Sequence, residues 1–335
     1  RRVCRDARSG DAVAAREVDC GRDSSGEMNG MKSWLRRIAL SILVVLVTVV
    51  AAGSIYELAG RRAARREFPP PGVLVDIGGR RIHLDCRGTG APIVVLQSGL
   101  DVNGSTSWST VHDSLAATAR TCAYSRAGVM WSDRSPGPVT AKGIADDLHA
   151  ALLEAGERPP FVMVGHSLGG PLVTTFTKYF PDEVAGLVFV DASHPDQVQK
   201  LAEFSPTLAN PSLTRFKIGA TFAWTGLTRF MTRGTQPMPG QATETARMVN
   251  AYTPYSVVAN LEERVAFNAI VEDAGTFRQL GDRPLVVLTA LLPMPASFLK
   301  RSKLNAAQGE EITRMWKALH EDEASWSTHS RHVLL

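Results

Sequence analysis

The sequence lacks the charge excess and the clustered metal ligands that mark nucleic-acid-binding and metal-dependent proteins. Its 335 residues carry 37 Lys and Arg against 33 Asp and Glu, a formal net charge of +4. The eight histidines do not pair with cysteines or carboxylates at metal-ligand spacing, and no glycine-rich phosphate loop occurs. We therefore expect no nucleic-acid partner, no metal and no nucleotide cofactor.

Cysteine is also scarce, with four residues in the chain. Cys4 and Cys20 lie in a polar N-terminal segment, whereas Cys86 and Cys122 lie in two segments expected to be β-strands. Two small buried thiols are one interpretation of the second pair. Because these strands would be neighbours in the expected sheet, a disulfide formed outside the cytosol is the other.

Charge is absent from residues 38–56, a run of 19 residues dominated by Leu, Val, Ile and Ala. At about 1.5 Å per residue, a helix of this length reaches roughly 28 Å, which just spans a bilayer. Basic residues flank both ends, so they do not give the orientation. We expect a single N-terminal membrane anchor; a cleaved signal peptide, with small residues at 51–53, and a buried soluble helix are the alternatives. An anchor or a signal places the following domain outside the cytosol.

These features divide the chain into four parts. Residues 1–30 are polar and without pattern, and we expect a disordered leader that need not be native. Residues 31–60 contain the anchor, and residues 61–72 form a basic and then proline-rich linker. Residues 73–335 are expected to form one folded domain.

Short apolar runs bounded by turn residues predict the strands of this domain. They cover residues 72–77, 81–86, 92–97, 121–125, 161–164, 184–190 and 284–289, with helical patterns at 141–155 and 168–179. Alternating strands and helices predict an α/β fold, a mostly parallel sheet with helices on both faces. The interval from about 195 to 281 has helical patterns, several aromatic residues and no strand pattern, so we expect a helical cap over the sheet.

The sharpest motif is Gly165-His166-Ser167-Leu168-Gly169, placed directly after an apolar strand and directly before a helix. Strand, sharp turn and helix are the context of a nucleophile elbow, in which Gly165 and Gly169 leave room for close backbone contacts. A glycine-rich turn with a serine cap is the alternative. We predict that Ser167 is a catalytic nucleophile.

A serine nucleophile needs hydrogen-bond donors for the oxyanion that develops in the reaction. The amide of Leu168, at the start of the helix, supplies one donor. The second should come from the loop after the strand at 92–97, and we assign it to the amide of Leu100.

The segment at residues 71–195 resembles the α/β-hydrolase superfamily, in particular its bacterial membrane-anchored or secreted serine hydrolases. The resemblance rests on GGRRIHLDCRG, YSRAGVMWSD, VGHSLGG and LVFVDASHPD, and it extends over roughly residues 56–335. It implies the α/β-hydrolase fold and an esterase-like activity. Relatives often have Asp where Ser125 stands and Gly where Met130 stands.

Asp191 is the predicted acid of the catalytic triad. It closes the strand at 184–190, which places it at the same sheet edge as Ser167, and Ser before Asp is the expected chain order. A loop residue that binds nearby amides is the alternative. Many relatives place the acid after the next strand, but residues 290–293 have no carboxylate there, and Asp322 and Glu323 lie in an expected surface helix.

The catalytic base is expected outside the printed sequence. Relatives carry the histidine in a loop just after the last strand, and residues 331–335 are expected to lie within that strand. His332 is then structural, His166 points away from the nucleophile in such elbows, and His194 belongs to the loop after Asp191. We expect the catalytic histidine after Leu335.

The leading functional hypothesis is a serine hydrolase that cleaves a carboxylic ester or similar small acyl substrate. The apolar cap favours a hydrophobic substrate, and amidase, peptidase, perhydrolase and C–C hydrolase activities stay open. Dehalogenase and epoxide hydrolase chemistry is disfavoured because those relatives use Asp at the position of Ser167. A non-catalytic, membrane-tethered binding protein of the same fold is the alternative.

Overall fold

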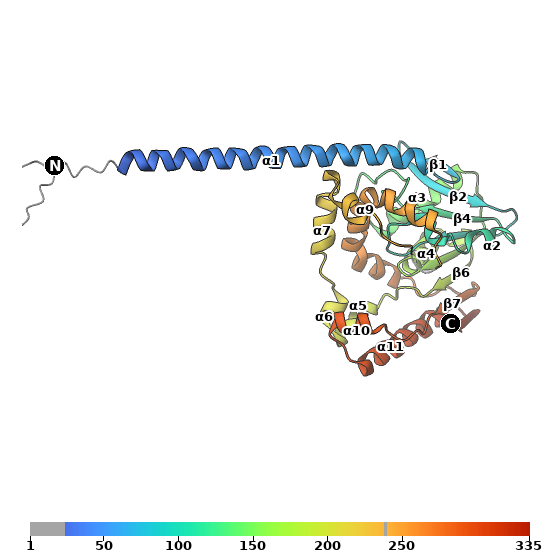
Figure 1. The fold of residues 1–335 in the computed structure, drawn as a ribbon. Coiled ribbons are helices and arrows are strands. Elements are labelled where there is room, and N and C mark those ends of the chain that lie inside the picture. The colour runs from blue at the N-terminus through green and yellow to red at the C-terminus, as the bar shows by residue number, and fades with distance from the viewer. Residues whose placement is uncertain (1–23, 238–239) are drawn as a thin grey trace, which may run out of the picture. The chain divides into compact units, whose positions relative to one another are not determined.

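The computed structural model describes residues 24–237 and 240–335 and divides into two compact units, Arg1–Val50 and Ala51–Leu335. Helix α1 (Ser24–Glu67) contains the apolar run (Figure 1). Among the described residues it is the one helix that is long and apolar enough to cross a membrane, by length and composition. The expected leader lies outside the described residues as far as residue 23, and residues 24–30 are helical.

Residues 61–67 form the last turns of α1, whereas the sequence analysis expected a linker there. Ala64 and Phe68 are buried in the domain. Phe68 O accepts hydrogen bonds from Trp131 Nε1 and Tyr252 OH, each at 3.0 Å. Arg and Ala are strong helix formers, so the basic segment continues the helix until it packs on the domain.

An eight-stranded sheet forms the centre of the domain, in the order β1-β2-β4-β3-β5-β6-β7-β8. The strands are β1 (Val73–Asp76), β2 (Arg81–Arg87), β3 (Ile93–Gln97), β4 (Thr121–Ser125), β5 (Phe161–His166), β6 (Val184–Val190), β7 (Leu285–Thr289) and β8 (Ser330–Leu334). β2 pairs antiparallel with β1 and β4, and the other neighbouring pairs are parallel. The predicted α/β architecture is confirmed, including the last strand at the end of the printed sequence.

Successive residues of the parallel strands pack on opposite faces of the sheet. Val95 belongs to the same buried cluster as Phe176 of α4 (Gly169–Tyr179), whereas Leu96, on the other face, belongs to a second cluster with Trp108 of the 3-10 helix η1. Coverage of both faces explains why these strands are continuous apolar runs. The other helices outside the cap are η1 (Gly104–Trp108), α2 (His112–Ala116), α3 (Ala141–Glu154), η2 (Pro181–Glu183), α10 (Ala296–Ser302) and α11 (Ala306–Ser325).

Between β6 and β7 the chain forms the expected helical cap, and every element there in the described residues is a helix (Figure 1). These are α5 (Gln197–Phe204), α6 (Pro206–Ala209), α7 (Thr214–Thr221), η3 (Ala223–Thr225), α8 (Leu227–Thr232) and α9 (Thr243–Gly275). The long helix α9 packs on α4, the helix that follows the elbow. The cap is thereby joined to the part of the sheet that carries Ser167.

Cys86 and Cys122 are directly opposite each other in the β2–β4 pair and form a disulfide. Of the two interpretations of these cysteines, the disulfide is the one that the structure has. It ties the antiparallel edge of the sheet to the parallel strands.

Replacing both cysteines, in Cys86→Ala/Cys122→Ala, should lower the free energy of unfolding. The bond closes a loop with a sequence separation of 36 residues. Loss of that constraint on the unfolded chain is expected to cost about 4 kcal/mol, measured by urea unfolding. Reduction of the wild-type protein should give the same loss, and equal alkylation with and without reductant would contradict the disulfide.

His83 of β2 is a buried histidine in the same part of the sheet. Its Nδ1 lies 3.2 Å from Ser125 Oγ, its Nε2 contacts Pro71 O, and its ring lies 4.5 Å from that of Trp131. Burial lowers the pKa of His83 to about 4. The folded state therefore favours the neutral ring.

Acid should destabilise the protein through His83. Because its folded pKa lies below the unfolded value, its contribution is complete above about pH 6.5 and is lost as the pH falls toward about 4. We expect the unfolding free energy to fall by about 3 kcal/mol less over this range in His83→Gln than in the wild type. The measurement is urea unfolding at several pH values, with the exposed His329→Gln as control; identical pH profiles of all three proteins would contradict this role.

Candidate active site

The backbone turns sharply between β5 and α4. Ser167 has a φ of +52°, in the left-handed region that residues with a β-carbon seldom adopt. A β-carbon added at Gly165 would lie 2.4 Å from Gly169 O, and one added at Gly169 would lie 2.3 Å from Gln97 O. Contacts inside the turn therefore require glycine on both sides of the serine.

Ser167 lies partly exposed at the carboxyl end of β5. Its amide donates to Val190 O at 3.2 Å, and its carbonyl accepts from Ser193 N at 2.9 Å. Within residues 24–237 and 240–335, no group forms a hydrogen bond with its hydroxyl. The backbone of Ser167 is thus fixed on both sides, while its hydroxyl is accessible and without a partner.

The loop after β3 lies directly against this turn. A β-carbon added at Gly99 would lie 3.1 Å from Ser167 Cβ. In the described part of the chain, the amides of Leu100 and Leu168 donate no hydrogen bond. Two peptide NH groups without partners, on two loops that meet at a serine, are the donor set that an oxyanion requires.

A buried ion pair positions this loop. The guanidinium of Arg126, just after β4, donates to Ser98 O at 2.7 Å and to Gly99 O at 2.6 Å. It also donates to the two carboxylate oxygens of Glu263 on α9, at 2.6 and 2.8 Å. Burial lowers the pKa of Arg126, but the Glu263 carboxylate outweighs this effect and raises it, so the guanidinium stays charged.

The contact with Gly99 O orients the proposed oxyanion donor. The carbonyl of Gly99 and the NH of Leu100 belong to one peptide unit, and in a planar trans peptide these groups point in opposite directions. A guanidinium that holds the carbonyl therefore directs the NH away from Arg126. The role of Arg126 in holding this loop could not be predicted from the sequence, because its partner Glu263 lies 137 residues further along the chain.

Asp191 follows β6 as Ser167 follows β5. His166 and Val190 are paired in the parallel register, so Ser167 and Asp191 come directly after opposed residues, on strands that lie about 4.8 Å apart. Asp191 also has a positive φ, +45°. Its Oδ1 accepts hydrogen bonds from Trp316 Nε1 at 2.9 Å and from Ala290 N at 3.3 Å. The hydrogen bond from Ala290 N is the kind expected if Asp191 is a loop residue that binds nearby amides.

Two buried histidines near this edge have both ring nitrogens engaged. His194 Nε2 lies 3.0 Å from Asp322 Oδ2, and its Nδ1 accepts from Asp196 N at 3.0 Å. His320, which the sequence analysis did not consider, contacts Thr289 Oγ1 at 2.8 Å and Ala192 O at 2.9 Å. Burial lowers the pKa of both histidines.

Of the other two candidate histidines, His166 lies apart from this network and His332 lies at its margin. His166 is exposed, and its ring meets that of Trp108 edge-on at 6.4 Å. His332 lies within β8, as expected, and its Nε2 lies 2.7 Å from Thr289 Oγ1. A hydrogen bond to a strand residue is consistent with the structural role expected for His332.

Asp322 and Glu323 lie in α11, which is a helix as expected, but Glu323 is buried and not on the surface. Burial and the nearby carboxylates of Asp322 and Asp191 raise the pKa of Glu323. Trp316, His320 and Glu323 occur at helical spacing on α11, which is the sequence signal for a face turned toward the sheet.

The described residues contain one grouping of metal-ligand side chains, Cys86, Cys122 and Glu157. The two cysteines are joined in a disulfide, so their sulfur atoms are not thiolate ligands.

Glu263→Gln should destabilise the protein strongly, because it leaves the Arg126 guanidinium buried without its counter-charge. We expect a loss of about 3 kcal/mol or more in unfolding free energy. The matched control is Glu262→Gln, a change at the exposed neighbouring residue on α9, which should have little effect. Equal stability of the two variants would contradict the positioning role of the pair.

Parts of the chain are similar to known proteins. Residues 91–216 match the family model for the alpha/beta hydrolase fold, a range that includes the elbow and Asp191. The protein named "Probable transporter efuK" of Hormonema carpetanum is 36% identical over 130 residues, 36% of this chain and 18% of that protein. An uncharacterized vacuolar membrane protein of Saccharomyces cerevisiae is 31% identical over 112 residues, 32% of this chain and 17% of that protein. The match thus spans less than a fifth of each of these two relatives.

A solved structure, that of a thermophilic esterase from Thermogutta terrifontis, has a similar fold. Its TM-score is 0.50 at 19% sequence identity, and the match covers 78% of this chain and 89% of the esterase. The chain has the α/β-hydrolase fold, as its sequence motifs predicted.

Proposed function

We propose that the protein is a serine hydrolase that cleaves a carboxylic ester or a similar small acyl substrate. The observation that carries the proposal is that the loop after β3 lies against the turn at Ser167, and that the Ser167 hydroxyl and the amides of Leu100 and Leu168 have no hydrogen-bond partner among the described residues. An accessible serine hydroxyl together with two free NH donors is the arrangement that acyl transfer requires.

The proposed reaction has two steps. Ser167 Oγ attacks the carbonyl carbon and loses its proton to the base, the oxyanion is held by the two amides, and the C–O bond breaks as the leaving alcohol takes that proton. In the second step the base takes a proton from water, the water oxygen attacks the acyl carbon, and the carboxylic acid is released as Ser167 Oγ regains its proton. We assign the acid of the triad to Asp191 and the base to a histidine. His194 and His320 do not suit that role, because both ring nitrogens of each are already engaged by other partners.

The proposed substrate carries a hydrophobic acyl or alcohol part. Support comes from the cap, which covers the sheet with helices rich in aromatic side chains, and from the absence of acidic residues between Ser205 and Thr243. A cofactor plays no part in the proposed chemistry.

We further propose that α1 anchors the protein in a membrane through residues 38–56, with the domain outside the cytoplasm. The length and composition of α1 support the anchor. The Cys86–Cys122 disulfide supports an oxidising compartment. Secretion after cleavage of a signal peptide is the alternative.

A fluorophosphonate probe tests the hydrolase proposal on the full gene product. We expect labelling of the wild-type protein, complete loss of labelling in Ser167→Ala, and unchanged labelling in Ser193→Ala, a change at a neighbouring serine in the loop after β6. Labelling that survives Ser167→Ala would contradict the assigned nucleophile. An unlabelled wild-type protein would favour the non-catalytic binding protein instead.

A further inference from the structure

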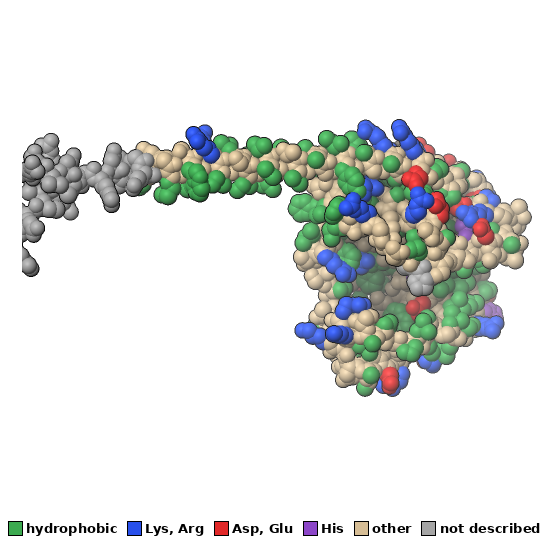
Figure 2. All heavy atoms as spheres, viewed as in Figure 1, with side chains coloured by type: hydrophobic (Ala, Val, Ile, Leu, Met, Phe, Trp, Pro, Cys, Tyr) green, Lys and Arg blue, Asp and Glu red, His purple; other side chains and the backbone are tan. Residues whose placement is uncertain are grey.

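The cap exposes a row of large apolar side chains on α7, η3 and α8. They are Ile218, Phe222, Trp224, Leu227, Phe230 and Met231, and their exposed fractions run from 42% to 73%. Figure 2 shows hydrophobic side chains gathered over this part of the cap. Single exposed apolar residues are ordinary, but a contiguous group with two Phe and one Trp marks a surface that meets something other than water. We call this group the cap patch.

The cap patch is joined to α1 by close backbone contact. A β-carbon added at Gly53 would lie 2.2 Å from Thr225 O, and one added at Gly226 would lie 2.6 Å from Gly53 O. Because Gly53 and Gly226 have no side chains, the backbone of α1 can contact the backbone at the start of α8. The loop between η3 and α8 therefore lies directly against residue 53 of α1.

An ion pair fixes the same contact one turn further along α1. Arg229 of α8 donates to Glu57 at 2.8 Å, and Arg61 donates to the same carboxylate at 2.7 Å. Glu57 is buried to 2% exposure, so the pair is enclosed. These contacts fix α8 beside residues 53–57 of α1.

Residues 53–57 lie at the C-terminal end of the apolar run. Gly53 lies inside the charge-free residues 38–56, and Ile55 and Leu58 are exposed beside it. If residues 38–56 cross a bilayer, the cap patch meets the membrane where the hydrocarbon gives way to headgroups. Trp and other amphipathic aromatic side chains are enriched at that depth.

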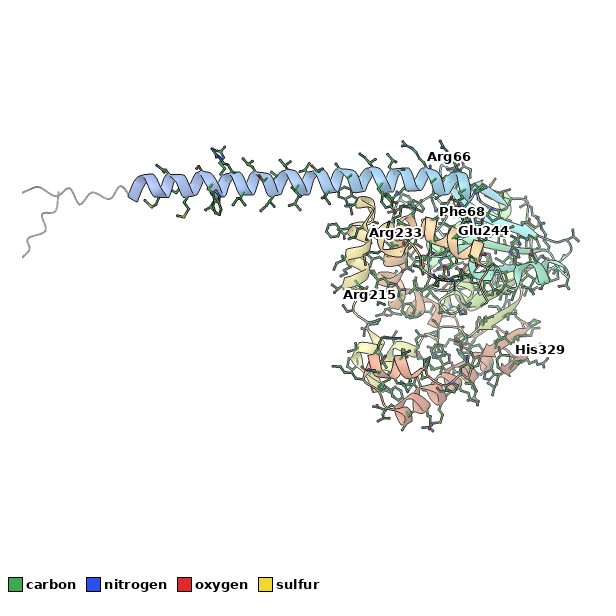
Figure 3. The ribbon with its side chains drawn as sticks, in the orientation of Figure 1. Arg66, Phe68, Arg215, Arg233, Glu244 and His329 are labelled. Carbon is green, nitrogen blue, oxygen red and sulfur yellow. A yellow bond between two sulfur atoms is a disulfide. The ribbon has the colours of Figure 1, made fainter. Side chains whose placement is uncertain are left out.

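The chain segment that carries the patch has charges of one sign. From Ser205 to Thr243 the chain has no Asp or Glu, and it has four cations. Arg229 is paired with Glu57, whereas Arg215, Lys217 and Arg233 have no ion-pair partner among the described residues. Figure 3 labels Arg215 and Arg233 on the cap. Arg233 lies over the ring of Phe230, 4.0 Å from its centroid. Apolar side chains bordered by unpaired cations are complementary to a surface with anionic headgroups.

We propose that the cap patch is a membrane-docking surface, and that its occupant is a lipid bilayer containing anionic lipids. The apolar side chains enter the outer part of the bilayer, and Arg215, Lys217 and Arg233 contact headgroup phosphates. The inference rests on the proposed anchor and is independent of the hydrolytic chemistry. It places the cap of the site against the lipid, so an amphiphilic ester would approach from the bilayer.

Site-directed fluorescence quenching tests this proposal on the full chain. In a Cys4→Ser/Cys20→Ser background, an environment-sensitive fluorophore is attached at Met231→Cys in the patch. The matched control is Val111→Cys, an exposed apolar position outside the cap, and Ile42→Cys reports on the anchor. Each protein is reconstituted in phosphatidylcholine–phosphatidylglycerol vesicles with and without lipids that carry a nitroxide near the top of the acyl chain.

The proposal predicts that nitroxide lipids remove most of the fluorescence at Met231→Cys and Ile42→Cys, and little at Val111→Cys. Quenching at Ile42→Cys with Met231→Cys no more quenched than Val111→Cys would overturn the docking surface and leave the anchor intact. Quenching at neither position would overturn both. Self-quenching at Met231→Cys that depends on protein density, without lipid quenching, would show that a second copy covers the patch and would also overturn the proposal.

Charge reversal separates the contribution of the cations. Arg215→Glu/Lys217→Glu should reduce quenching at Met231→Cys in vesicles that contain phosphatidylglycerol, and less so in phosphatidylcholine alone. Lys200→Glu, at an exposed cation of α5, should leave the quenching unchanged. Equal effects of the two sets of changes would overturn the assigned role of the cations.

Discussion

The left-handed backbone at Ser167 is the constraint on which the rest of the site depends. A φ of +52° at a residue with a β-carbon costs roughly 1–3 kcal/mol, which the surrounding contacts must offset. Hydrogen bonds to β6 on one side and to the loop after it on the other hold the residue in place. Because Asp191 has a similar conformation at the end of the neighbouring strand, both side chains are raised from the same edge of the sheet.

The buried pair of Arg126 and Glu263 joins this edge to the cap. Taking two charges out of water is costly, and the pair is matched by hydrogen bonds from the same guanidinium to two loop carbonyls. One end of the pair sets the peptide that contains the Leu100 amide, and the other end lies on α9. The position of the long cap helix and the orientation of a donor at Ser167 are therefore mechanically connected. The cap also contacts α1 through Gly53 and Glu57, so the same helical layer links the site to the apolar segment.

Much of this arrangement could be predicted from the sequence, and the exceptions have physical causes. The elbow was predictable because only glycine fits at the positions of Gly165 and Gly169. The strands were predictable because burial on both faces of the sheet leaves continuous apolar runs in the sequence. The helical conformation of residues 61–67 could not be predicted, since basic residues suit a solvated linker and a helix equally well. Packing of Ala64 and Phe68 on the domain favours the helix. Arg126 and Glu263 were missed because a long-range ion pair has no local pattern. Glu323 was placed on the surface because a Glu side chain is seldom fully buried.

The central claim is that the Leu100 and Leu168 amides converge on the position that the oxygen of a Ser167 adduct occupies. A crystal structure of the protein with a phosphonate bound covalently to Ser167 measures this directly. One phosphonyl oxygen is expected to lie about 2.7–3.1 Å from both amide nitrogens. A phosphonyl oxygen directed into solvent, with both amides still without partners, would contradict this arrangement of donors.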